Sequence, residues 1–76
     1  MEKIIEILKE IKPGAEINEN TALIDEHIID SLAMINLVGT LSDEFDVDIS
    51  ARDITPENFA TPAAIQSLIE RLEDED

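Results

Sequence analysis

Apolar residues return at helical spacing in three separate stretches of this chain, and this periodicity limits the fold more than any other feature. The stretches cover about residues 2–12, 31–45 and 62–72. Pro13-Gly14 ends the first one, because neither residue supports a helix interior. Residues 46–50 alternate as a strand would, but no second segment is suited to pair with them. The sequence therefore predicts an all-α fold in which 46–50 is an extended connector.

Two threonine–proline pairs mark the starts of further helices. A threonine side chain can cap free N–H groups, and proline is well tolerated at the first helical position. Thr55-Pro56 predicts a very short helix that ends near Phe59, and Thr61-Pro62 predicts a helix that runs to about Leu72. The expected architecture is a small bundle of three longer helices plus one short helix, packed around aliphatic side chains.

The length and charge of the chain restrict its partners. Seventy-six residues predict a single domain, residues 1–76, with a frayed acidic tail at 73–76. Nineteen acidic residues against five basic ones give a formal charge of −14, which repels nucleic acid and anionic membranes and favours basic protein surfaces. No apolar run approaches the roughly 20 residues of a membrane span, and Met1-Glu2-Lys3 opens a helical pattern instead of a signal peptide. We expect a cytoplasmic monomer.

Few residues could support catalysis. The chain has no cysteine, and His27 is its only histidine. A thiolate nucleophile and a zinc–thiolate site are therefore excluded, together with every serine–histidine pair that does not use His27. We expect His27 to be a loop residue without a catalytic role, and we expect a protein that is not an enzyme.

One stretch has partial calcium-site spacing. Asp46, Asp48, Ser50 and Glu57 occupy positions 1, 3, 5 and 12 of an EF-hand loop. The sixth position, which needs glycine for a sharp turn, is Ala51. A calcium-binding protein is therefore a weaker alternative, and no metal site is predicted.

Asp30-Ser31-Leu32 stands where a long irregular stretch gives way to the second predicted helix. Residues 13–30 have no period, and a loop of that length in a small domain is usually functional. Its apolar residues are expected to pack across the bundle; they are Ile17, Leu23, Ile24, Ile28 and Ile29. Aspartate and serine also commonly cap a helix, so the tripeptide alone is weak evidence of function.

The second predicted helix, Ser31 to Phe45, separates its apolar residues into two groups when plotted at about 100° per residue. The core stripe holds Met34, Leu37, Val38, Leu41 and Phe45. Leu32 and Ile35 point away from it, toward solvent. We therefore expect an exposed serine flanked by two exposed apolar side chains.

Three blocks of the chain, residues 23–32, 43–49 and 54–62, together resemble acyl carrier proteins and related aminoacyl or peptidyl carriers. Those carriers bear a 4′-phosphopantetheine arm on a serine, and Ser31 falls on that serine. The resemblance implies a covalent arm on Ser31, with Asp30 and Leu32 beside it. A phosphodiester there would lie at a helix N-terminus, which favours anions. The arm's thiol would hold an acyl or aminoacyl group as a thioester while partner enzymes act on it.

The resemblance also implies partners and contact residues. The partners are a phosphopantetheinyl transferase, an acyl- or aminoacyl-activating ligase, and a downstream synthase or transferase with a basic docking surface. Expected partner contacts are Leu32, Ile35, Asn36, Asp43 and Glu44. An acyl chain held between the helices would be lined by Leu37, Leu41, Ile54, Phe59 and Ile65.

Two departures from carriers of bulk fatty-acid biosynthesis shape the expected pathway. Ala33 and Asn36 stand where those carriers commonly have acidic residues, and Ile28-Ile29 stands where they often have a glycine-containing pair. The sequence favours a dedicated carrier in a specialised acyl or polyketide-type pathway. The alternative is a D-alanyl or other aminoacyl carrier for cell-wall or nonribosomal-type chemistry. An acidic adaptor without covalent cargo is a further alternative.

Overall fold

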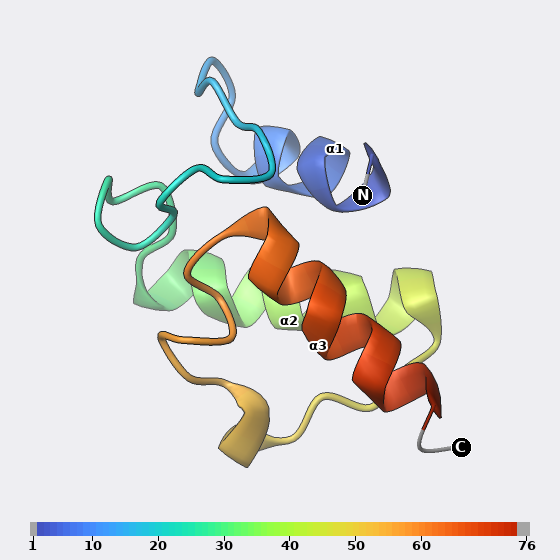
Figure 1. The fold of residues 1–76 in the computed structure, drawn as a ribbon. Helices are drawn as coiled ribbons and strands as arrows, with labels where there is room; N and C mark the ends of the chain where they lie inside the picture. The colour runs from blue at the N-terminus through green and yellow to red at the C-terminus, as the bar shows by residue number, and fades with distance from the viewer. Residues whose placement is uncertain (1, 75–76) are drawn as a thin grey trace.

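The computed structural model describes residues 2–74, which form three α-helices, one short 3₁₀ helix and no strand (Figure 1). In chain order the elements are α1 (Glu2–Ile11), α2 (Ser31–Phe45), η1 (Ala51–Asp53) and α3 (Pro62–Asp74). Helix α1 packs against both α2 and α3. The predicted all-α bundle is confirmed. None of the helices in the described part of the chain combines the length and apolar surface that a membrane crossing needs.

The helix ends follow from local chemistry. Beyond α1, Gly14 has a φ of +88°, a conformation that glycine adopts without strain. Helix α2 ends at Phe45, and the capping residue that follows, Asp46, is left-handed and donates its N–H to the Ser42 carbonyl. At the start of α3, the Ala64 N–H donates to Thr61 Oγ1 at 3.1 Å. The predicted threonine cap is therefore present.

The prediction of a short helix from Thr55 to Phe59 is wrong. Thr55 does cap this segment, since Asn58 N donates to its Oγ1 at 3.1 Å and Phe59 N donates to its carbonyl at 3.2 Å. The segment makes only one turn, because the Ala60 carbonyl accepts from Leu23 N at 2.8 Å and residue 61 precedes a proline.

The short helical element lies earlier, at η1. Ser50 N–H and Oγ–H both donate to Asp53 Oδ2, at 3.4 and 2.9 Å, and Asp53 N donates to the Ser50 carbonyl at 2.9 Å. This reciprocal capping pattern stabilises the first turn of a helix. At the other end of the chain, α3 includes Glu73 and Asp74, so these two residues of the predicted frayed tail are helical. Residues 75–76 of that tail lie outside the described part.

The 13–30 connection crosses the bundle as predicted, and in Figure 1 it runs above the start of α3. Its backbone bonds to that region twice: Leu23 N donates to the Ala60 carbonyl, and Ala63 N donates to the Glu19 carbonyl at 3.1 Å. Three of its apolar anchors are buried and two are half-buried; the buried ones are Ile17, Leu23 and Ile29. The connection is therefore part of the structural framework that leads into α2.

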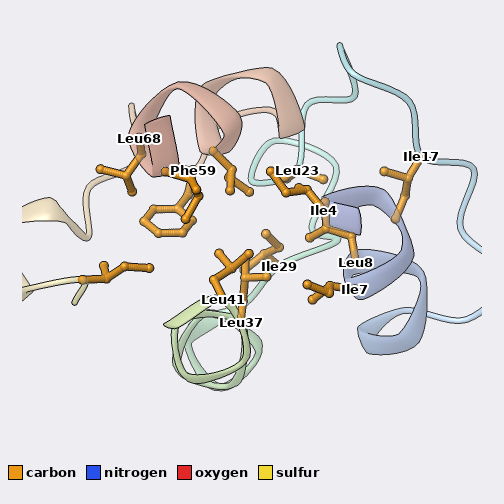
Figure 2. Packing of buried hydrophobic residues seen from close by; sticks show 13 residues of the cluster. Ile4, Ile7, Leu8, Ile17, Leu23, Ile29, Leu37, Leu41, Phe59 and Leu68 are labelled. Atoms are coloured by element: carbon orange, nitrogen blue, oxygen red, sulfur yellow. The ribbon is translucent and has the colours of Figure 1, made fainter. Parts of the chain in front are cut away.

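The core joins all three helices and the connection (Figure 2). Its fully buried large side chains include Ile4, Leu8, Leu23, Leu37, Leu41, Phe59 and Ile65. In Figure 2, Leu37 and Leu41 project from α2 toward the space occupied by Phe59. Each such side chain contributes about 1.5–3 kcal/mol through burial. This packing fixes α2 by its inner stripe and leaves its first turn at the surface.

Candidate functional site

Ser31 is the first residue of α2, and its side chain is exposed, as predicted. The residue before it supplies the cap: Asp30 is extended, and its Oδ1 accepts the Ala33 N–H at 2.8 Å. The Asp30 carbonyl accepts the Met34 N–H, also at 2.8 Å. Because Asp30 caps the helix, the Ser31 hydroxyl is free of that role.

The position of Ser31 suits an anion. The Ser31 and Leu32 N–H groups belong to the first turn of α2 and have no intrahelical acceptor. Asp30 Oδ1 engages the next N–H along, that of Ala33. The first two N–H groups and the positive end of the helix dipole therefore remain close to Ser31, where they favour a phosphate group.

The Asp30 cap gives a direct stability prediction. We expect Asp30→Ala to lower the free energy of unfolding by about 1 kcal/mol, because the Ala33 N–H loses its acceptor. Asp30→Asn keeps an acceptor oxygen and should retain most of that stability. Urea unfolding of the three proteins measures the difference, and an equal loss in both variants would contradict a capping role.

The apolar residues beside Ser31 lie where the helical plot placed them. Leu32 is 75% exposed and Ile35 is 70% exposed. Asn36 is exposed beside them. We call Leu32, Ile35 and Asn36 the α2 face. Two large aliphatic side chains left in water next to an exposed serine are typical of a surface that meets another protein.

Asp43 and Glu44 lie at the other end of α2. Both are exposed, and Glu44 Oε2 forms an ion pair with Lys3 Nζ at 3.2 Å. Such a half-exposed pair contributes at most about 1 kcal/mol. A rise of about 1.5 Å per residue puts these carboxylates nearly 20 Å along the helix from Ser31. The structure therefore does not bring them together with the α2 face.

The five predicted pocket residues divide into two groups. Leu37, Leu41, Phe59 and Ile65 are completely buried and belong to one core cluster. Ile54 is 38% exposed and is not among those buried core residues. A chain placed among the first four would have to force the core apart.

Ile54 instead lines a hollow of about 440 Å³ beside Ser31. The other lining residues are Ile24, Ile29, Asp30, Ser31, Met34 and Ile35. Ile24 and Met34 are at the site although their sequence patterns predict packing for Ile24 and a core position for Met34. No periodic signal links Ile24 or Ile54 to the start of α2, because both lie in irregular segments.

The partial calcium-loop spacing does not fold as a calcium site. Asp46 caps α2 in a left-handed conformation, and Ser50 Oγ is hydrogen-bonded to Asp53. Across residues 2–74, no three histidine, aspartate or glutamate side chains gather closely enough to hold a metal ion. His27 is an exposed loop residue with a φ of 58°, and its backbone N–H donates to the Ile24 carbonyl at 3.1 Å.

Comparisons with known proteins show the class of protein to which this helical bundle with its exposed Ser31 belongs. Residues 1–72 match the family of the phosphopantetheine attachment site. The D-alanyl carrier protein of Listeria welshimeri is 32% identical over 73 residues, which cover 93% of this chain and 94% of that protein. The D-alanyl carrier protein of Bacillus cereus strain B4264 is 29% identical, with 93% and 92% covered.

A solved structure is similar throughout. One chain of a structure described as "Crystal structure of FAD-dependent dehydrogenase" superposes with a TM-score of 0.79 at 32% identity, covering 87% of this chain and 96% of that chain. This chain belongs to the phosphopantetheine attachment family: it is a carrier protein with a covalent 4′-phosphopantetheine group. The exposed first turn of α2 and the hollow beside it fit such a group.

Proposed function

We propose that this protein carries an amino acid, in the manner of a D-alanyl carrier, as a thioester on a 4′-phosphopantetheine arm attached to Ser31. The observation that carries the proposal is the exposed Ser31 hydroxyl at the start of α2. Asp30 caps this helix, so the hydroxyl is not needed as a cap. The similarity to D-alanyl carrier proteins over 93% of the chain supports the choice of an aminoacyl cargo.

Attachment needs only a reachable hydroxyl and a place for the phosphate. The Ser31 oxygen bonds to the phosphorus that carries pantetheine in coenzyme A, the bond from that phosphorus to the nucleotide part breaks, and the hydroxyl proton passes to a base of the transferase. The product phosphodiester lies beside the free Ser31 and Leu32 N–H groups. When bound, the arm supplies a thiol that holds the cargo as a thioester. Partner enzymes supply the catalysis.

The core supports a short cargo held outside the bundle. Leu37, Leu41, Phe59 and Ile65 fill the interior, so a long acyl chain among them would separate packed side chains. A charged amino group placed there would also lose its hydration without gaining a partner. The acyl-pocket role of these residues therefore belongs to the competing proposal, a carrier in a specialised acyl or polyketide-type pathway.

A charging experiment distinguishes the two cargo classes. We expect the protein that carries the phosphopantetheine arm, without cargo, to accept D-alanine from a D-alanine-adenylating enzyme at least tenfold faster than it accepts a fatty acyl group from an acyl-activating ligase. The intact mass of the protein measures both rates. We also expect the methyl and ring NMR signals of Leu37, Leu41, Phe59 and Ile65 to stay unchanged on charging with alanine. Preferential fatty acylation with shifts at these residues would favour the acyl pathway.

The α2 face is proposed as the contact for partner enzymes, with Asp43 and Glu44 meeting basic residues farther along the helix. Leu32 and Ile35 expose about three quarters of their side chains, so changing them costs little folding energy. We expect the double variant Leu32→Gln, Ile35→Gln to raise the transferase KM by at least tenfold, because each aliphatic side chain buried at an interface contributes about 1 kcal/mol or more and about 1.4 kcal/mol corresponds to a factor of ten. The melting temperature should stay within a few degrees.

A matched control for the α2 face is Gln66→Ala. Gln66 lies on α3, where its side chain donates to Glu70 Oε1 at 2.9 Å on the surface. This variant should leave the KM unchanged. A double α2 variant with native KM would show that partners bind elsewhere.

The similar solved chain favours a second candidate for the downstream step. Because that structure is named for an FAD-dependent dehydrogenase, a flavin enzyme is a candidate to oxidise the carried group. Two electrons and two protons would pass from the cargo to FAD. Bleaching of flavin absorbance by the charged protein, and none by the uncharged protein, would support this route.

Cellular placement follows from the chemistry. Coenzyme A, which loading consumes, is a cytoplasmic metabolite, so we propose a cytoplasmic carrier. We also propose that it acts as a monomer and avoids nucleic acid and membrane insertion, because its charge of −14 repels anionic surfaces and further copies of itself.

A further inference from the structure

The hollow beside Ser31 depends on a segment far from it in sequence. Six of its seven lining residues come from residues 24–35, and the seventh is Ile54. Ile54 lies between η1 and the turn at 56–59. The width of the hollow is therefore set by the position of the segment 51–60, which we call the Ile54 loop.

Packing alone holds Ile54 weakly. Its side chain is 38% exposed, and its backbone is neither helical nor part of a sheet, with φ −86° and ψ 83°. Its N–H donates to the Ala51 carbonyl at 3.2 Å, a bond within the same loop. Segments with few buried contacts open at low free-energy cost unless other bonds fix them.

Asn58 makes the hydrogen bonds that fix the Ile54 loop. Both the nitrogen and the oxygen of its side-chain amide are engaged. Its Nδ2 donates to the carbonyl of Asp53, the residue before Ile54, at 2.8 Å. Its Oδ1 accepts from Arg71 Nη2 of α3 at 3.1 Å. Its backbone N–H donates to Thr55 Oγ1 at 3.1 Å. Among the side-chain bonds of residues 2–74, the one to Arg71 joins the Ile54 loop to the body of α3.

We propose that Asn58 is a positioning residue for the loading of Ser31. Its side chain links the Asp53 carbonyl to Arg71 of α3 and thereby fixes the position of Ile54. Ile54 lines the hollow beside Ser31, and the transferase reaches the serine through this hollow. This role rests on the proposed attachment at Ser31. Asn58 itself does not line the hollow, so it acts through Ile54.

Two variants separate its bonds. Asn58→Ala loses both side-chain bonds, and Asn58→Asp keeps an acceptor for Arg71 but loses the donor to the Asp53 carbonyl. In both, we expect amide exchange at Ile54 to accelerate by roughly five- to tenfold, the equivalent of one lost hydrogen bond. The transferase KM should rise at unchanged kcat, by the factor by which the fraction of molecules with Ile54 in place falls, and that factor is at most about five- to tenfold. Gln66→Ala, which removes a surface amide elsewhere on α3, should change neither.

A double-mutant cycle that combines Asn58→Ala with Ile54→Ala tests whether Asn58 changes the transferase KM through Ile54. If Asn58 acts through Ile54, Asn58→Ala raises the KM no further once Ile54 is already alanine. Independent, multiplying effects would overturn the proposal and leave a general structural role. Unchanged Ile54 exchange in Asn58→Ala would also overturn it.

The outcomes separate this role from the proposed function. If the native chain loads at Ser31 but Asn58→Ala keeps the native KM, only the positioning role fails. If the native chain does not load at Ser31 at all, the proposed function fails and the positioning role fails with it. Amide exchange at Ile54 is measured on the protein without the phosphopantetheine arm. It therefore shows whether Asn58 fixes Ile54 even if the native chain does not load.

Discussion

Ser31→Ala abolishes attachment of the 4′-phosphopantetheine arm: the expected result is no added mass after incubation with coenzyme A and a broad-specificity transferase. Alanine has no oxygen to attack the phosphorus, and no other side chain can replace that atom at the start of α2. Folding should be nearly unaffected, because Asp30 caps the helix and alanine is a strong helix former. The unfolding free energy should change by less than about 0.5 kcal/mol.

The chain offers a matched control for this loss. Ser67 is exposed on α3, away from a helix start, so Ser67→Ala removes a comparable hydroxyl. It should load as fully as the native chain. Residual loading of Ser31→Ala would contradict the assignment, and loss of loading in Ser67→Ala would show that the assay reports folding instead of attachment.

Phe59→Ala removes most of the stability of the fold. Phe59 is fully buried in the core, and truncating a buried phenylalanine costs about 3–5 kcal/mol. A domain of this size has a total stability of only about 4–11 kcal/mol. We therefore expect the melting temperature to fall by roughly 15 °C or more. Thermal unfolding followed by circular dichroism measures the change.

Two further variants show whether burial is the cause. Phe59→Leu keeps most of the volume and should cost much less than Phe59→Ala. Ile54→Ala removes a side chain that is already 38% exposed, so its cost should also be smaller. Equal losses in all three proteins would contradict the central position of Phe59 in the core.

Helix positions were predictable because each helix carries its own boundary signals. The second predicted helix, 31–45, matches α2 in both bounds, and Thr61-Pro62 marks the start of α3. The exposure of Leu32 and Ile35 followed from the same periodicity. These features depend on residues close together in sequence.

Errors arose where a local signal competed with a distant contact. Thr55 does cap the segment that follows it, as the sequence predicts. The Ala60 carbonyl, however, accepts a hydrogen bond from Leu23 N, so the expected helix stops after one turn. The Ser50…Asp53 spacing is a recognisable capping pattern and could have indicated η1.

Long-range pairs could not be read from the sequence. The Lys3–Glu44 ion pair and the Arg71–Asn58 bond join residues that lie in different elements. The hollow beside Ser31 has the same origin, because it forms only when Ile54 comes against the start of α2. The pathway and cargo depend on partners, and the residues of the carrier constrain them only indirectly.

Mapping the arm to one residue by tandem mass spectrometry tests the attachment to Ser31 most directly. The native chain is incubated with coenzyme A and a broad-specificity transferase, digested with trypsin and fragmented. The peptide that ends at Arg52 contains Ser31, Ser42 and Ser50, and the remaining serine, Ser67, lies in a later peptide. A single phosphopantetheine on Ser31 is the predicted result, whereas an arm on any other serine, or none on the folded chain, would contradict it.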